Sequence, residues 1–195
     1  DGAAGAPAHA AAGGGGGAGA KDRLNWGPHR WARAFACAAP QTTLCWCPPS
    51  VQHGPTLLSA GVDFYITLWD VATGEPVRKL REHRDFVTSL LYLDRSAMFA
   101  SASLDRTVIV WSLQHRKCER KRVLRSRQPV KKLSATADVL VTCGLHSATV
   151  YDLALGSRVC DVGSGHRAPL VGAHAVSFID HVRGPQQRCV TADVA

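Results

Sequence analysis

One stretch of the sequence concentrates the side chains that are most able to bind a charged ligand. Residues 116–132, "RKCERKRVLRSRQPVKK", contain nine Lys or Arg and one Glu, whereas the rest of the chain carries 14 basic and 14 acidic side chains. Positive charge at this density attracts nucleic acid or an acidic protein surface such as that of tubulin. The candidate contacts are Arg116, Lys117, Arg120, Lys121, Arg122, Arg125, Arg127, Lys131 and Lys132.

The same basic stretch also has a purely structural interpretation. Lys and Arg on an exposed edge strand discourage that strand from pairing with another sheet. The residues by themselves leave both interpretations open. Aromatic side chains that could stack on bases are absent from 116–132, so any binding of nucleic acid is expected to be nonspecific charge attraction.

Motifs for catalysis, cofactors and metals are missing from the sequence. There is no Walker loop, no dinucleotide-binding glycine pattern, no Gly-x-Ser-x-Gly and no His-Glu-x-x-His. The seven cysteines never occur as Cys-x-x-Cys, and the nine histidines lack ligand spacing. We therefore expect no metal, no cofactor and no small-molecule substrate. An odd number of cysteines without a secretory signal predicts reduced, buried thiols in an intracellular protein.

A repeat of about 41 residues must position these side chains. Its aromatic marks are Trp69, Trp111 and Tyr151, at spacings of 42 and 40 residues, and Asp63 and Asp105 lie six residues before the two tryptophans. The segments between these marks are rich in residues that favour strands. For the best copy we expect strands at Val87–Leu93, Ala97–Ser103, Thr107–Leu113 and Cys118–Arg125.

This repeat predicts an all-β fold, an incomplete β-propeller of four-stranded antiparallel blades. A four-stranded sheet that is apolar on both faces cannot bury them alone, whereas radial stacking of such sheets buries both. We expect a partial propeller over 42–195, in a fragment of a longer protein. The expected blades are approximately 42–83, 84–127, 128–166 and a truncated 167–195, preceded by a disordered Ala/Gly-rich tract at 1–20 and an unassigned linker at 21–41.

The segments "ITLWD" at 66–70, "SASLDRTVIVW" at 101–111 and "SGH" at 164–166 resemble the WD-repeat family of propellers. The resemblance implies a buried hydrogen-bonded set of His, Ser, Asp and Trp in a blade. The matching residues of the best copy are His83, Ser101, Asp105 and Trp111, with Asp63 and Trp69 at the same places in the preceding copy. A catalytic Ser-His-Asp set is the alternative, but the repeated phase favours a structural role.

The chain also departs from the family pattern. Glu82 stands before His83 where the family usually has Gly, and the third copy has His146 and Tyr151 in the Asp and Trp places. Arg125-Ser126-Arg127 stands where that copy would need its Gly-His pair, and the first copy has no convincing His. Only the second copy can therefore contain the complete set.

The resemblance further implies a non-catalytic scaffold that binds other proteins through a face built by the loops between strands. Its candidate contacts in the second copy are Glu82, Arg84, Asp85, Leu104 and Arg106. The alternative is a nucleic-acid- or microtubule-associated factor that binds through 116–132. No apolar run approaches the length of a transmembrane helix. We therefore expect no membrane contact and an intracellular, cytoplasmic protein, with the cytoskeleton or a cilium as further locations.

Overall fold

The computed structural model describes residues 35, 37–50, 54–93, 97–114, 117–162, 170–180 and 184–193. Within these ranges the chain forms strands and turns and no helix, which confirms the predicted all-β fold. None of the described segments is a helix that could cross a membrane. The tract 1–20, most of the linker 21–41 and His166 of "SGH" lie outside the described residues, so what was expected of them stays a prediction.

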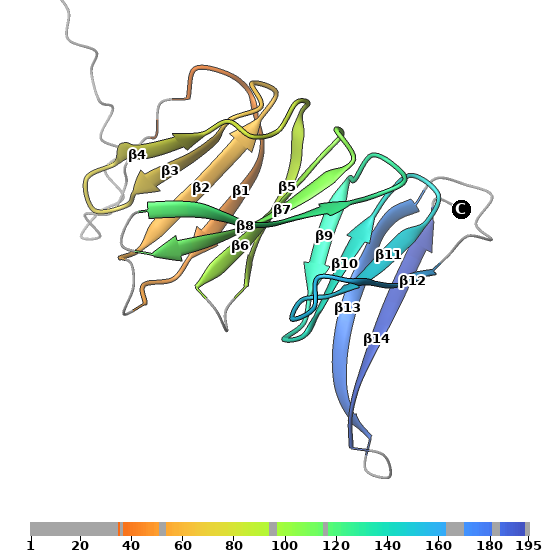
Figure 1. Cartoon of the computed structure of the whole chain (residues 1–195). Helices are drawn as coiled ribbons and strands as arrows, with labels where there is room; N and C mark the ends of the chain where they lie inside the picture. Colours follow the sequence, from red (N-terminus) through yellow and green to blue (C-terminus); the bar gives the residue numbers. More distant parts are fainter. Residues whose placement is uncertain are drawn as a thin grey trace, which may run out of the picture. The chain divides into compact units, whose positions relative to one another are not determined.

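Twelve strands form three four-stranded antiparallel sheets, and in each sheet consecutive strands are neighbours (Figure 1). The first sheet contains β1 (Gln41–Cys47), β2 (Thr56–Gly61), β3 (Ile66–Asp70) and β4 (Glu75–Leu80). The second contains β5 (Val87–Leu93), β6 (Met98–Ser103), β7 (Thr107–Gln114) and β8 (Lys117–Arg125). The third contains β9 (Lys132–Ala135), β10 (Val139–Cys143), β11 (Ala148–Asp152) and β12 (Arg158–Val162), and a hairpin of β13 (Leu170–Asp180) and β14 (Gly184–Asp193) follows it.

The strands of the second sheet lie within one residue of the predicted bounds. Strand β13, the first strand after the third sheet, begins at Leu170. Leu170 and Ala173 are buried in one cluster with Val141 and Val150 of the third sheet. This packing, which the local pattern does not show, extends the strand toward its N-terminal end.

Strand β7 shows how the middle sheet buries both faces. Successive side chains of a strand point to opposite faces, and every residue from Val108 to Leu113 is buried. Ile109, Trp111 and Leu113 belong to a core cluster shared with the first sheet. Val108 and Val110 belong to a cluster shared with the third sheet. The two-sided apolar pattern thus makes neighbouring sheets stack through common cores, as blades do.

Hydroxyl groups fix the sheets to one another at equivalent places. Thr42 Oγ1 donates to the carbonyl of Val87, and Thr88 Oγ1 donates to the carbonyl of Val130 at 2.7 Å. Both threonines lie at a bulge in the first strand of their sheet. The residue after each threonine, Thr43 or Ser89, accepts a backbone N–H from the next sheet at 3.2 Å. These contacts set the relative register of consecutive sheets.

The expectation that the thiols are buried holds for only some of the described cysteines. Cys45, Cys47, Cys118 and Cys143 are buried, but Cys37 and Cys160 are exposed. A hydrogen bond with Cys45 and burial raise the pKa of Cys47, and burial raises the pKa of Cys118 to about 12. These buried thiols stay protonated at neutral pH and are poor nucleophiles. Cys160 lies on the edge strand β12, of which the residues Arg158–Asp161 are all exposed.

Candidate functional site

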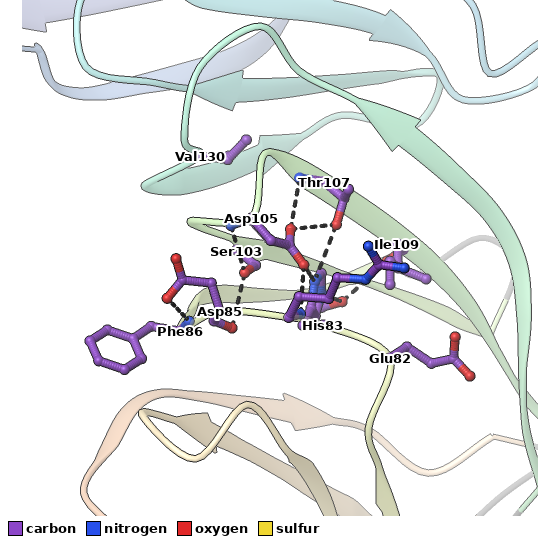
Figure 2. A network of polar contacts seen from close by, with 12 residues as sticks. Glu82, His83, Asp85, Phe86, Ser103, Asp105, Thr107, Ile109 and Val130 are labelled. Atoms are coloured by element: carbon purple, nitrogen blue, oxygen red, sulfur yellow. Dashed lines mark hydrogen bonds and ion pairs between the residues drawn. The ribbon is translucent and has the colours of Figure 1, made fainter.

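Four side chains of the second sheet form one hydrogen-bonded set, and Figure 2 shows the part of it around His83 and Asp105. His83 precedes β5, Ser101 lies on β6, Asp105 lies in the β6–β7 turn and Trp111 lies on β7. His83 Nδ1 is 2.9 Å from Asp105 Oδ2, and His83 Nε2 is 2.8 Å from Ser101 Oγ. Trp111 Nε1 donates to Ser101 Oγ at 2.9 Å.

The donors and acceptors of this hydrogen-bonded set match in one arrangement of the protons. Because the Asp105 carboxylate only accepts, His83 Nδ1 carries the proton and donates to it. His83 Nε2 of a neutral ring then accepts the hydroxyl proton of Ser101, whose oxygen accepts the indole N–H. Among the described residues, no buried side-chain nitrogen or oxygen lacks a partner. The set therefore stabilises the buried histidine without leaving a polar group unpaired.

Asp105 is the centre of this network. Thr107 Oγ1 donates to Asp105 Oδ1 at 2.6 Å, and the backbone N–H of Thr107 donates to the same oxygen at 2.9 Å. The backbone N–H of Arg84 donates to Asp105 Oδ2 at 3.0 Å. Burial acts to raise the pKa of Asp105, but the hydrogen bonds from Thr107, Arg84 and His83 outweigh it and lower the pKa. The role of Thr107 was not foreseen from the sequence, although this residue follows Asp105 by two positions in the hairpin.

We expect the stability of the protein to depend on pH through Asp105. Its pKa in the folded state lies below the ordinary value of 3.8, so its ionised form stabilises the fold above about pH 4, and this contribution is lost as the pH falls through the folded pKa. The free energy of unfolding should be measured from pH 7 to pH 3 for the wild type and Asp105→Asn. The difference between the two should shrink below pH 4; a constant difference would contradict the role of the carboxylate.

The geometry resembles a Ser-His-Asp catalytic set, but the burial of the serine argues against catalysis. Ser101 has 0% exposure and His83 has 4%. A nucleophile must reach a substrate, and Ser101 Oγ is instead occupied by Trp111 and His83. The described residues also bring no three potential ligands together for a metal ion. A structural role explains both the hydrogen bonds and the burial.

The first sheet contains only part of this network. Trp69 Nε1 donates to Ser59 Oγ at 2.9 Å, as Trp111 does to Ser101. Cys37 stands four residues before β1, as His83 stands four before β5, and its sulfur is 4.0 Å from Ser59 Oγ. Asp63 accepts one hydrogen bond within the described residues, from the backbone N–H of Tyr65 at 3.4 Å. Asp63 and Trp69 are therefore not joined through a histidine.

In the third sheet, Gln128 takes the place of the missing histidine. It lies four residues before β9, and its Oε1 accepts the backbone N–H groups of Leu145 and His146 at 3.1 Å each. Its Nε2 donates to Ser147 Oγ at 3.2 Å. An amide can thus hold the β10–β11 turn without a charged pair. Gln128 was not foreseen from the sequence, because the Gly-His pair was expected within 125–127.

The five predicted partner contacts differ in their exposure and in the hydrogen bonds or ion pairs that they already make. Arg84 and Arg106 are exposed. Glu82 pairs with Arg120 at 2.8 Å, and Asp85 Oδ1 accepts the backbone N–H of Phe86 at 2.7 Å. Leu104 is partly buried, and its N–H donates to the Phe86 carbonyl. The arginines are therefore the better candidates for contacts with a partner.

An aromatic pair on the same loops was not foreseen from the sequence. Phe64, in the β2–β3 turn, contacts Phe86, which precedes β5, with ring centroids 5.8 Å apart. Phe86 is 41% exposed. Phe64 and Arg106 follow the equivalent residues Asp63 and Asp105 and have φ values of 66° and 67°. This left-handed conformation costs about 1 kcal/mol or more for a residue with a side chain, and it presents both side chains on the loop face.

The structure divides the predicted basic stretch into two groups. Arg120 pairs with Glu82, Lys121 pairs with Glu119 at 3.2 Å, and Arg122 donates to the carbonyls of Leu153 and Ala154. Arg125, Lys131 and Lys132 are exposed, and Arg127 is exposed with Asp161 3.9 Å away. Arg116 and the side chain of Lys117 lie outside the described residues. The charge that is free to attract a ligand is therefore concentrated between β8 and β9.

Comparison with known families matches one segment, which spans parts of the first and second sheets. Residues 74–112 match the family model described as WD domain, G-beta repeat. The chain contains a WD repeat. The matched segment runs from β4 of the first sheet to β7 of the second, so the WD repeat is offset by one strand from the sheet. One repeat therefore contributes to two neighbouring sheets.

Two curated proteins of Arabidopsis thaliana show the extent of the WD-repeat similarity. The U3 snoRNP-associated protein-like EMB2271 is 36% identical over 65 residues, which are 33% of this chain and 14% of that protein. Protein ROOT INITIATION DEFECTIVE 3 is 37% identical over 62 residues, 32% of this chain and 14% of that protein. The chain thus matches a small part of each of these relatives.

Proposed function

We propose that this WD-repeat chain is a non-catalytic scaffold, part of a larger multi-repeat protein, that binds other proteins through the loop face around Asp105. The observation that carries this proposal is the contrast between buried and exposed groups on these loops. The groups that could do chemistry are buried and paired, whereas Arg84, Arg106 and Phe86 are exposed on loops that the Asp105 network holds in place. Rigid loops with exposed Arg and aromatic side chains favour tight binding, because little entropy is lost on association.

Charge reversal on the loop face should test this proposal. We expect Arg84→Glu and Arg106→Glu each to weaken binding of the partner proteins recovered with the wild type by roughly tenfold or more, about 1.4 kcal/mol. Lys79→Glu, which makes the same change on the exposed strand β4, is the matched control and should bind like the wild type. Affinities should be measured on each purified partner, with thermal unfolding to show that the variants are folded. Equal affinity of all three variants would contradict the loop face as the binding site.

A second candidate function is binding of nucleic acid or an acidic surface through Arg125, Arg127, Lys131 and Lys132. Two observations favour it: these side chains are exposed, and one relative is named as associated with the U3 snoRNP. If all four cations contacted single-stranded RNA, the affinity should fall about 50-fold between roughly 50 and 200 mM salt.

The measurement for this candidate is RNA binding by fluorescence anisotropy across that salt range. The variant Lys131→Ala/Lys132→Ala should lower the affinity and flatten the salt dependence. Arg120→Ala is the control, because this cation is already paired with Glu82. Binding that is insensitive to salt, or lost equally in both variants, would rule this candidate out.

A further inference from the structure

A groove of about 830 Å³ lies between the second and third sheets, at the end opposite to the Asp105 turn. Leu93, Met98 and Val110 of the second sheet line it, together with Leu153 of the third. Two cations of β8, Lys121 and Arg122, and one carboxylate, Asp138, also line it. It is therefore separate from the loop face of the proposed scaffold, and it combines an apolar lining with an excess of positive charge.

The groove has a specific origin in the repeat. In each sheet the aromatic residue of the repeat lies on the third strand. It is paired across the sheet with one residue of the second strand, and that residue is in turn paired with one residue of the first strand. Trp69 aligns in this way with Leu57 and Trp46, and Trp111 aligns with Phe99 and Tyr92. In the third sheet Tyr151 aligns with Leu140 and Ala135.

The third sheet thus has a methyl group where the other two have a large aromatic side chain. Tyr92 packs against the core between the first and second sheets. At the next seam its counterpart, Ala135, lines the groove, which Tyr92 itself also borders near the end of β5. The strands there are also shorter, with four residues in β9 against seven in β5. The space that one aromatic ring fills at the first seam is therefore open at the second.

The basic wall of the groove is held in place before any ligand binds. Arg122 donates from Nη1 to the carbonyls of Leu153 and Ala154 at 3.1 and 3.2 Å. Gly156, at φ 67°, makes room for it, since a Cβ there would lie 2.2 Å from Arg122 Nη1. Nη2 also donates to the Ala154 carbonyl at 3.3 Å, and two of the five N–H groups of the guanidinium remain for a ligand. Lys121 is half exposed, and its pairing with Glu119 on the surface is weak.

We propose that this groove binds a segment of a partner protein that inserts an aromatic side chain beside Ala135 and places a carboxylate against Lys121 and Arg122. The aromatic ring replaces the side chain that the repeat omits at this seam, and the carboxylate complements the excess positive charge. The inference rests on the proposed scaffold function but concerns a different surface. It therefore predicts a partner contact that substitutions on the loop face leave unchanged.

The chain contains a single methionine, and this residue, Met98, lines the groove. A ¹³C-methyl-methionine label therefore gives one NMR signal that reports on the site. The probes are three capped pentapeptides: a central tryptophan between two glutamates, the same tryptophan between two lysines, and alanine between two glutamates. We expect the first to shift the Met98 signal with a dissociation constant on the order of 1 mM, and the other two to bind at least fivefold more weakly.

Variants of the groove distinguish this proposal from nonspecific binding of the peptides. Ala135→Tyr restores the aromatic ring of the preceding sheet and should weaken binding of the first peptide at least tenfold, whereas Ala135→Ser should leave it unchanged. Lys121→Glu should weaken binding of the peptide with tryptophan between two glutamates and strengthen binding of the peptide with tryptophan between two lysines. This variant replaces Ala135→Tyr as the test if Ala135→Tyr does not fold. Arg84→Glu on the loop face should not alter the response, so failure of the loop-face proposal and failure of this one are distinguishable.

Three results would overturn the proposal. The first is no change in the Met98 signal at several millimolar of the tryptophan–glutamate peptide. The second is an equal response in Ala135→Tyr and the wild type. The third is a Met98 signal that moves with protein concentration alone, which would identify a second copy of the chain as the occupant.

Discussion

Replacing Asp105 with alanine is expected to lower the free energy of unfolding by about 3 kcal/mol, because four donors, one of them on the buried His83, lose their shared acceptor at once. The side chains of His83 and Thr107 and the backbone N–H groups of Arg84 and Thr107 all point to this carboxylate. His83 is 4% exposed, so little water can reach it, and the remaining acceptor beside Nδ1 is the Thr107 hydroxyl at 3.2 Å. Chemical denaturation followed by tryptophan fluorescence would measure the loss.

The first sheet provides the matched control for this experiment. Asp63 occupies the place of Asp105 six residues before the tryptophan, but it accepts one long hydrogen bond of 3.4 Å from Tyr65 within the described residues. Asp63→Ala should therefore cost less than about 1 kcal/mol. Equal losses for the two variants would show that the turn, and not the histidine network, accounts for the stabilisation by Asp105.

Replacing Phe99 with alanine should have an effect of similar or greater size, a loss of about 3–5 kcal/mol. Phe99 has 0% exposure and lies in the core shared by the first and second sheets. Its ring stacks on Trp111, with centroids 5.9 Å apart. Alanine would open a cavity between two sheets and remove this contact, and a domain is typically stable by only about 5–15 kcal/mol. Thermal and urea unfolding would both report the change.

Phe86→Ala is the control for the Phe99 experiment. It removes the same side chain, but Phe86 is 41% exposed on the loop face, so the expected loss is below about 1 kcal/mol. Comparable losses from the two substitutions would mean that the sheets are not held together by their shared core.

The repeat and its strands were predictable because they depend on residues that are close in the sequence. The run of β-branched and aromatic residues in "TVIVWSL" and the turn residues of "LDRT" specify a hairpin locally, and the structure places β6 and β7 within a residue of the expected bounds. The spacing of Trp69, Trp111 and Tyr151 set the phase of the sheets. The four residues of the His83 network were named from a resemblance to WD repeats, and the structure shows how their hydrogen bonds connect.

Other features depend on contacts between residues far apart in the chain, which only the tertiary structure decided. Cys37 and Gln128 stand where two blades lack a histidine, and Gln128 was found only because its bonds to Leu145 and His146 cross 17 and 18 residues. Arg120 meets Glu82 across 38 residues, which turns part of a basic run into a paired surface.

The groove at Ala135 has the same cause. A small residue in a strand gives no local signal, and its effect depends on the sheet that packs against it. Sequence by itself therefore determined the fold of this protein, through short-range patterns repeated in phase. The stacking of the sheets decided which charges stay free and which space stays open, because both are properties of the seams between blades.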